Sequence, residues 1–380
     1  MGVIKIPFNK PHLTGNETKY IIEAVNSGHI SGNGVFTKKC QKYFEDNYGF
    51  KKALLTTSCT DALEMCAILA NIEPGDEVII PSYTFVSTAL AFVRQGAKIV
   101  FIDSMEDHPN MDADQLEALI TKRTKAIVPV HYAGVACDMG KIMAIANKYN
   151  LIVIEDAAQA IDSYYKQKPL GSIGHMAAFS FHETKNINSG EGGLLAINDE
   201  RFIKRAEIIW EKGTNRAEFF RGEVNKYGWV DTGSSFLPSE IIAAYLWAQL
   251  ENLNIIQTKR KEIWHTYYNL LWDFANHNNI KLPFIPSYST NNGHMFYLIC
   301  ENSSQREKLI THLKNNDIYA VFHYLSLHKS AFYKDKHGER NLPNSDEYTE
   351  RLIRLPFFYN ISENDLKFIC KTLIQFNSST

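Results

Sequence analysis

One lysine lies between an aromatic approach and a glycine-rich exit in residues 180–193, SFHETKNINSGEGG. The ε-amine of Lys185 can act as a nucleophile toward a carbonyl and form a Schiff base. The glycines that follow permit tight turns and let a bulky planar group lie close to the backbone. A lone loop lysine is more often simply solvated, so the Schiff-base interpretation depends on the rest of the chain.

Amine chemistry at such a lysine needs an electron sink, which pyridoxal phosphate supplies. A carboxylate beside its pyridine nitrogen would keep that nitrogen protonated by charge pairing. Asp156 suits this role because it ends an apolar stretch, although a carboxylate at this point could also cap a helix. Glu155 would point to the opposite side of the strand.

The phosphate and the ring of this cofactor would need further partners. Cys59 and Thr60 stand where a helix is predicted to begin, and unpaired N–H groups at a helix start favour an anion. An ordinary Ser/Thr cap is the competing interpretation of the same residues. Ser180 could add a hydroxyl to the phosphate site. Phe85 could stack on the ring or simply fill the core, and Gln159 could bind the ring oxygen or be solvated.

The elements that must position these residues alternate between strands and helices. Apolar strands with helices between them predict a parallel sheet covered on both faces, hence an α/β fold. Ligands of such sheets bind at the carboxyl ends of the strands, where Phe85, Asp156 and Gln159 stand. The predicted strands are 77–80, 98–102, 124–130 and 151–154, and the predicted helices are 60–69, 86–95, 114–120 and 139–149.

The order of elements changes near residue 255. We therefore predict a large cofactor-binding domain over 1–255, including the N-terminal segment, and a smaller α+β domain over 256–380. Thr14 is predicted to cap the first helix, with Glu17 completing a capping box. Residues 213–235 predict one long loop, and loops of that length are usually functional.

Composition narrows the class of protein. The 380 residues carry a formal net charge of −2, which gives no basic field for nucleic acid or acidic lipid. Six cysteines without CxxC pairing, and without a histidine pair to complete a metal set, favour a reduced, cytoplasmic setting and no metal. No run approaches the roughly 18 apolar residues of a membrane span.

The sequence resembles the DegT/StrS family of pyridoxal-phosphate sugar aminotransferases, of fold type I, over essentially the whole chain. The resemblance implies that Lys185 forms the Schiff base with the cofactor and then moves protons. It also implies a homodimer with shared active sites, in which Ser235 or a nearby residue of the partner chain reaches the phosphate. The blocks that carry the resemblance are residues 57–63, 81–88, 130–134, 155–159, 180–186 and 190–193. The cofactor-binding residues that it implies are Cys59, Thr60, Phe85, Asp156, Gln159, Ser180, Lys185 and Ser235.

Within the family the chain is most similar to the transaminases that form dTDP-4-amino-4,6-dideoxygalactose for surface polysaccharides. This similarity implies transfer of the amino group of L-glutamate to C4 of dTDP-4-dehydro-6-deoxyglucose, with release of 2-oxoglutarate. Another nucleotide sugar, the C4 epimer or attack at C3 is the alternative. Cys59, Ser235 and Leu237 depart from the Gly, Asn and Arg of most members, and this subgroup shares the departures. Its blocks are residues 58–60, 129–137, 211–216, 233–237 and 321–324.

Two other functions compete with an aminotransferase. Related dehydratases replace the lysine with histidine, so Lys185 disfavours dehydration. A binding module on the same fold would leave Lys185 and Asp156 without a purpose. His323 and Tyr324 follow a predicted strand of the smaller domain, and we expect them to line the sugar-nucleotide cleft or to be surface loop residues.

Overall fold

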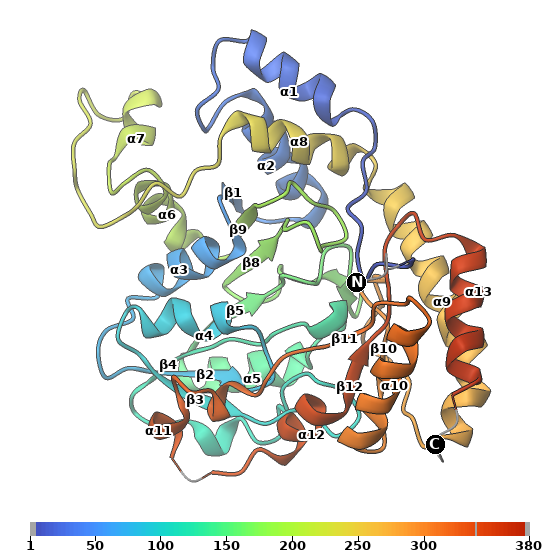
Figure 1. Cartoon of the computed structure of the whole chain (residues 1–380). Helices are drawn as coiled ribbons and strands as arrows, with labels where there is room; N and C mark the ends of the chain where they lie inside the picture. Colours follow the sequence, from blue (N-terminus) through green and yellow to red (C-terminus); the bar gives the residue numbers. More distant parts are fainter. Residues whose placement is uncertain (1–4, 339, 377–380) are drawn as a thin grey trace.

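The computed structural model describes residues 5–338 and 340–376 and is built around a seven-stranded sheet (Figure 1). The order across the sheet is β1-β9-β8-β5-β4-β2-β3. Strand β9 is antiparallel to both of its neighbours, whereas β8, β5, β4, β2 and β3 pair in parallel. The predicted α/β class with a mostly parallel sheet is confirmed. The strands are β1 Lys52–Thr56, β2 Glu77–Pro81, β3 Lys98–Ile102, β4 Thr124–Ile127, β5 Ile152–Asp156, β8 Met176–Ser180 and β9 Gly193–Ile197.

Helices cover both faces of this sheet because its strands are apolar on both sides. In β1, Leu55 belongs to one buried cluster and Leu54 to another, as the alternation of strand side chains requires. Helices α2, α5 and α8 pack into the first cluster, and α3, α4 and α6 into the second. The helices of residues 5–251 are α1 Glu17–Asn26, α2 Val35–Tyr48, α3 Cys59–Leu69, α4 Val86–Val93, α5 Met139–Tyr149, α6 Ile203–Trp210, α7 Arg216–Phe220 and α8 Glu240–Glu251. A two-stranded ribbon, β6 Tyr164–Tyr165 and β7 Lys168–Pro169, follows β5.

A smaller antiparallel sheet, in the order β10-β12-β11, lies toward the C-terminus (Figure 1). It has its own apolar cluster, to which Ile6 of the N-terminal segment also belongs. Helix α9, Leu253–His277, starts two residues before the predicted boundary and runs through it, so the division at residue 255 stays a prediction. The other elements are β10 Tyr297–Ile299, α10 Ser303–Asn315, β11 Val321–Phe322, α11 Lys334–His337, α12 Pro343–Arg351, β12 Leu352–Arg354 and α13 Glu363–Ile374.

Several local predictions were wrong. Helix α1 starts at Glu17 without a side-chain cap from Thr14, because the carboxylate of Glu17 itself accepts the N–H groups of Thr14 and Gly15. The helix predicted over 114–120 is only a short 3₁₀ turn, Glu117–Leu119. The loop predicted over 213–235 contains the five-residue helix α7.

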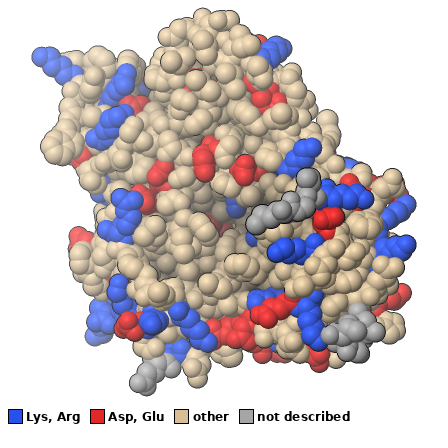
Figure 2. Space-filling view, viewed as in Figure 1, with Lys and Arg blue, Asp and Glu red and all other residues tan. Residues whose placement is uncertain are grey.

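The surface agrees with the near-neutral composition. Figure 2 shows Lys and Arg side chains interspersed with Asp and Glu on the face seen in Figure 1. Among the helices of the described residues, none has the length and apolar content needed to cross a bilayer.

Candidate active site

A cavity of about 1220 Å³ opens at the carboxyl ends of the sheet strands, where parallel α/β proteins bind their ligands. Segments from the large sheet form one side, and residues 321–331 and β12 form the other. Ten residues were predicted as site residues, and nine of them line this cavity. They are Cys59, Thr60, Phe85, Asp156, Gln159, Ser180, Lys185, His323 and Tyr324.

Lys185 lies on the turn that follows β8. Its backbone N–H donates to the carbonyl of His182 at 2.9 Å, which closes the turn and directs the residue to the cavity. The ε-amine makes no ion pair within 4.0 Å in the described part of the chain. Desolvation lowers the pKa of Lys185, and the nearby Asp156 carboxylate opposes that shift only in part. A larger share of the amine is therefore neutral and nucleophilic than on a surface lysine.

Asp156 is the last residue of β5 and is buried at the edge of the cavity. Oδ2 accepts the hydroxyl of Thr88 at 2.7 Å, and Oδ1 accepts the N–H of Ala158 at 3.1 Å. Burial raises the pKa of this carboxyl, and the Thr88 hydrogen bond works against the rise. No cation lies within 4.0 Å of it among residues 5–338 and 340–376, so a cationic ligand group would relieve its desolvation.

Glu155 points to the other side of β5, as predicted. It is buried against His131 at 2.9 Å and accepts the N–H groups of Gly171, Ile173 and Gly174. All these partners lie within the protein, so Glu155 has a structural role and Asp156 is the carboxylate that faces the cavity.

The start of α3 forms a polar corner of the cavity. Ser58 caps the helix by accepting the N–H of Asp61 at 3.0 Å. The N–H groups of Cys59 and Thr60 have no acceptor among the described residues, as is usual in the first helical turn. The hydroxyl of Thr60 lies 2.8 Å from the hydroxyl of Ser87. Ser87 was not among the predicted site residues. These donors and the helix dipole suit a phosphate.

Gly193, the first residue of β9, brings the glycine-rich exit against this corner. A Cβ on Gly193 would come within 2.4–2.5 Å of the backbone of Ser58 and Cys59. The glycine therefore allows β9 to approach the start of α3, and Ser180 pairs with Gly193 in the neighbouring strand. The glycine run was predicted to leave space for a planar group. At Gly193 the backbone of Ser58 and Cys59 occupies that space.

Phe85 stands at the open side of the cavity and is 55% exposed. A ring with this exposure does not belong to the hydrophobic core, so the competing interpretation of Phe85 as a core residue is wrong. Gln159 is anchored at both ends, because Oε1 accepts the N–H of Ala133 at 2.6 Å and Nε2 donates to Tyr324 at 2.9 Å. The amide retains a second N–H for a ligand oxygen.

His323 and Tyr324 are not surface loop residues. Their rings stack with centroids 3.6 Å apart, and Nδ1 of His323 lies 2.6 Å from the hydroxyl of Tyr132. Burial lowers the pKa of His323 well below its usual range, so the imidazole is neutral. Both residues line the cavity.

Ser235 is not among the lining residues of this cavity. It is exposed and forms a bridge with Glu211. Its contribution to a neighbouring subunit's site stays a prediction.

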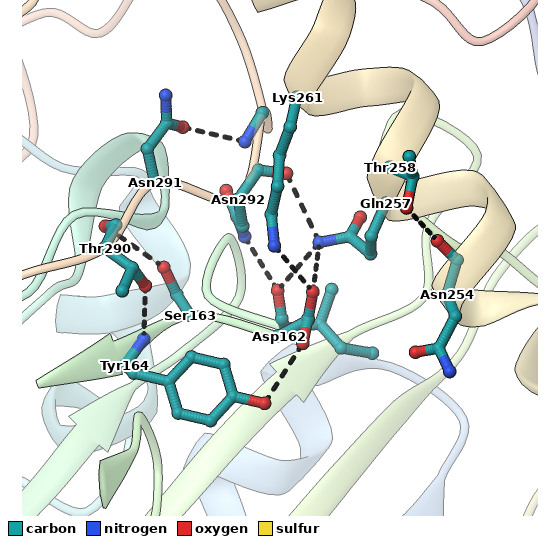
Figure 3. A network of polar contacts seen from close by, with 12 residues as sticks. Asp162, Ser163, Tyr164, Asn254, Gln257, Thr258, Lys261, Thr290, Asn291 and Asn292 are labelled. Carbon is teal, nitrogen blue, oxygen red and sulfur yellow. Dashed lines mark hydrogen bonds and ion pairs between the residues drawn. The ribbon is translucent and has the colours of Figure 1, made fainter. Parts of the chain in front are cut away.

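Figure 3 shows a network of polar contacts that includes Asn292, Asp162 and Gln257. Asn292 donates to the carbonyls of Gln159 and Ile161 at 2.8 and 2.9 Å and accepts the N–H of His294 at 3.0 Å. Nδ1 of His294 lies 2.7 Å from Oδ1 of Asn186, the neighbour of Lys185. The network therefore connects the loop after β5 to the lysine turn. Gln257, Lys261 and Tyr164 extend it through Asp162.

Sequence analysis missed several residues of the cavity wall. Thr88 and Ser87 belong to a block that was quoted, but only as neighbours of Phe85. His294 and Arg354 come from the smaller sheet region, and nothing in their spacing relates them to Lys185. Only the folded chain brings them to the cavity.

The groups that line the cavity fit pyridoxal phosphate. An amine of lowered pKa suits the aldehyde, and the start of α3 suits the phosphate. The buried Asp156 carboxylate, which has no cation within 4.0 Å among the described residues, suits the pyridinium nitrogen.

Comparison with known proteins agrees with this fit. The profile of the DegT/DnrJ/EryC1/StrS aminotransferase family matches residues 11–374. The spore coat polysaccharide biosynthesis protein SpsC of Bacillus subtilis is 34% identical over 95% of this chain and 94% of its own.

Solved structures give the same result. Spr1654 of Streptococcus pneumoniae, described as a sugar aminotransferase in its PMP form, is 26% identical with a TM-score of 0.90, over 97% of this chain and 98% of its own. DesV of S. venezuelae, solved with a ketimine intermediate, is 26% identical with a TM-score of 0.89, over 98% and 99%. The predicted fold type, enzyme class and pyridoxal-phosphate cofactor are confirmed, and the chain belongs to the DegT/DnrJ/EryC1/StrS aminotransferase family.

Proposed function

We propose that this chain moves the amino group of L-glutamate to C4 of dTDP-4-dehydro-6-deoxyglucose. The products are dTDP-4-amino-4,6-dideoxygalactose and 2-oxoglutarate. The observation that carries the proposal is the placement of Lys185, Asp156 and the start of α3 on one cavity of about 1220 Å³, which has room for a cofactor and a sugar nucleotide together. The choice of this sugar rests on the sequence blocks shared with the subgroup described above.

The residues that line the cavity would have different roles in binding the cofactor. When bound, pyridoxal phosphate supplies an aldehyde for amines and a pyridinium ring that withdraws electrons from the reacting carbon. Asp156 would hold the proton on the ring nitrogen, Thr60, Ser180 and the N–H of Cys59 would hold the phosphate, and Phe85 would cover the ring face.

Lys185 would carry protons at its ε-nitrogen. In the first half-reaction it would take the α-proton of glutamate, and in the second it would deliver a proton to C4 of the sugar. One cavity serves both substrates in turn, so ping-pong kinetics is expected. Gln159 would orient the ring hydroxyl through its remaining N–H.

We also propose that the enzyme is a cytoplasmic homodimer with shared sites that acts in surface-polysaccharide synthesis. The name of SpsC supports a polysaccharide pathway. Another nucleotide sugar, the other C4 epimer or amination at C3 is the alternative within the same reaction class.

The test is to incubate the holoprotein with L-glutamate and dTDP-4-dehydro-6-deoxyglucose. We expect 2-oxoglutarate together with an amino sugar nucleotide whose mass and NMR spectrum place nitrogen at C4 in the galacto configuration. The control is Lys185→Ala. Release of 2-oxoglutarate no greater than in this control contradicts an aminotransferase with this donor and acceptor, and nitrogen at C3 selects the alternative.

A further inference from the structure

Arg354, the last residue of β12, lines the active-site cavity, and no acidic residue in the described part of the chain pairs with it. Its Nε is buried without a hydrogen bond, and no carboxylate of the described residues lies within 4.0 Å of the guanidinium. The guanidinium lies over the ring of Phe8, 4.7 Å from the centroid. Arg354 is thus a half-buried cation at a cavity wall, with a buried Nε that lacks a hydrogen bond, and such a group indicates an anionic ligand.

Two other cations near this wall differ from Arg354. Lys329 lines the same cavity but pairs with Asp346 at 2.6 Å. Arg260 is buried behind the wall, and its guanidinium donates to the carbonyls of Gly293 and His294 at 2.9 and 2.8 Å. Lys329 and Arg260 each have a polar partner within the protein, whereas the guanidinium of Arg354 has none among the described residues.

The surroundings of Arg354 indicate which anion it meets. Arg354 and Lys185 line the same cavity, and the positive charge of Arg354 adds to the desolvation that lowers the pKa of Lys185. In an amino-acid donor the α-carboxylate is one carbon away from the reacting amine. In a nucleotide sugar the diphosphate is attached to C1, across the ring from C4. A cation near the reacting amine therefore suits the amino acid better than the diphosphate.

We propose that Arg354 binds the α-carboxylate of the amino-acid donor. This inference rests on the proposed aminotransferase function. The planar guanidinium can donate two parallel hydrogen bonds to one carboxylate, which a lysine at this position could not do. Arg354 therefore acts in the amino-acid half-reaction and is dispensable in the sugar half-reaction.

The two half-reactions can be measured separately by the absorbance change of the cofactor. Holoprotein with L-glutamate reports the first, and the pyridoxamine form with dTDP-4-dehydro-6-deoxyglucose reports the second. For Arg354→Gln we expect kcat/KM of the first to fall by about 100-fold or more, with the second changed by less than about 3-fold. Arg354→Lys should lie between Arg354→Gln and wild type in the first half-reaction, because it keeps the charge without the planar fork.

The matched control is Lys329→Gln, which removes a cation from the same cavity and should leave the glutamate half-reaction within about 3-fold of wild type. The thermal midpoint and cofactor absorbance of Arg354→Gln should match those of wild type. Equal loss in both half-reactions, or no loss in the first, overturns the assignment of Arg354. If wild-type protein fails to convert L-glutamate to 2-oxoglutarate, the proposed function itself is wrong.

Discussion

The hydroxyl of Thr88 donates a hydrogen bond of 2.7 Å to Oδ2 of Asp156, so a side chain of α4 orients the carboxylate that ends β5. Thr88 lies in turn 3.0 Å from the hydroxyl of Thr84, which fixes its own orientation. Three polar groups thus extend from the loop after β2 to the cavity. The arrangement holds Asp156 in place and stabilises its ionised form, both of which a pyridinium partner requires.

Thr88→Val should weaken cofactor binding without unfolding the protein. The substitution preserves shape but removes the donor to Asp156, so the carboxylate loses one hydrogen bond and its pKa rises further. We expect the Kd for pyridoxal phosphate to increase about 10-fold, corresponding to one hydrogen bond to a charged group. Equilibrium titration of apoprotein measures it. Thr88→Ser keeps the hydroxyl and should bind pyridoxal phosphate with the Kd of wild type. If Thr88→Val also binds with that Kd, Thr88 does not support cofactor binding through Asp156.

Asp156→Asn should separate stability from function. Burial raises the pKa of Asp156 above its usual value, so above that pKa the ionised carboxylate costs folding free energy, and the cost disappears once the group is protonated. We therefore expect the Asn apoprotein to be at least as stable as wild type near pH 7, with the difference shrinking as pH falls toward about 4.

Bound pyridoxal phosphate should reverse the order of stability of the Asp156→Asn and wild-type proteins. Without the carboxylate the pyridine nitrogen loses its charge partner, so the rise in thermal midpoint on adding pyridoxal phosphate should be smaller, and transamination should fall by about 100-fold or more. Thermal unfolding of apo and holo forms over a pH series is the measurement. A clearly less stable Asn apoprotein near pH 7 would show that the carboxylate is structural.

The strand-end rule explains why most of the site could be predicted. Phe85 follows β2 and Asp156 is the last residue of β5, and parallel strands bring such positions to one edge whatever their order in the sheet. The Thr88 contact could not be predicted because it depends on the order β5-β4-β2, in which α4 after β2 reaches across to β5. Arg354 was missed because β12 is only three residues long and follows a charged helix. Spacing alone does not indicate either contact.

Lys185 should react with pyridoxal phosphate at lower pH than an ordinary lysine. Desolvation lowers its pKa, so protonation costs more in the folded protein, and the reactive neutral amine persists to lower pH. The rate of appearance of a borohydride-reducible absorption band should rise with pH and level off below about pH 10, since free lysine titrates near 10.4. Lys185→Ala should show no such phase. A plateau only above the ordinary lysine pKa would contradict the desolvated environment.

The network in Figure 3 should contribute to stability more than to chemistry. Asn292→Ala leaves the carbonyl of Gln159 without its donor in a buried site and leaves that of Ile161 with only the longer bond from Gln257 at 3.4 Å. We expect a loss of about 2–3 kcal/mol in the free energy of unfolding. Urea unfolding of the apoprotein measures it. Asn254→Ala, on the exposed side of α9, is the matched control and should change the same quantity by less than about 0.5 kcal/mol. Equal effects of the two substitutions would show that the network contributes little.

Phe85→Ala should affect the cofactor and leave the fold nearly unchanged. The ring is 55% exposed in the apoprotein, so its removal forfeits little buried apolar area, and the free energy of unfolding should change by less than about 1 kcal/mol. If the ring covers the face of bound pyridoxal phosphate, its loss removes a stacking contact worth about 0.5–1.5 kcal/mol, and Kd should increase about 2- to 10-fold. Phe220→Ala is the control: Phe220 is 69% exposed on α7 and lies outside the cavity wall. Phe220→Ala should have the same free energy of unfolding as Phe85→Ala and the same Kd for pyridoxal phosphate as wild type. If both variants lose affinity equally, Phe85 makes no specific contact with the cofactor.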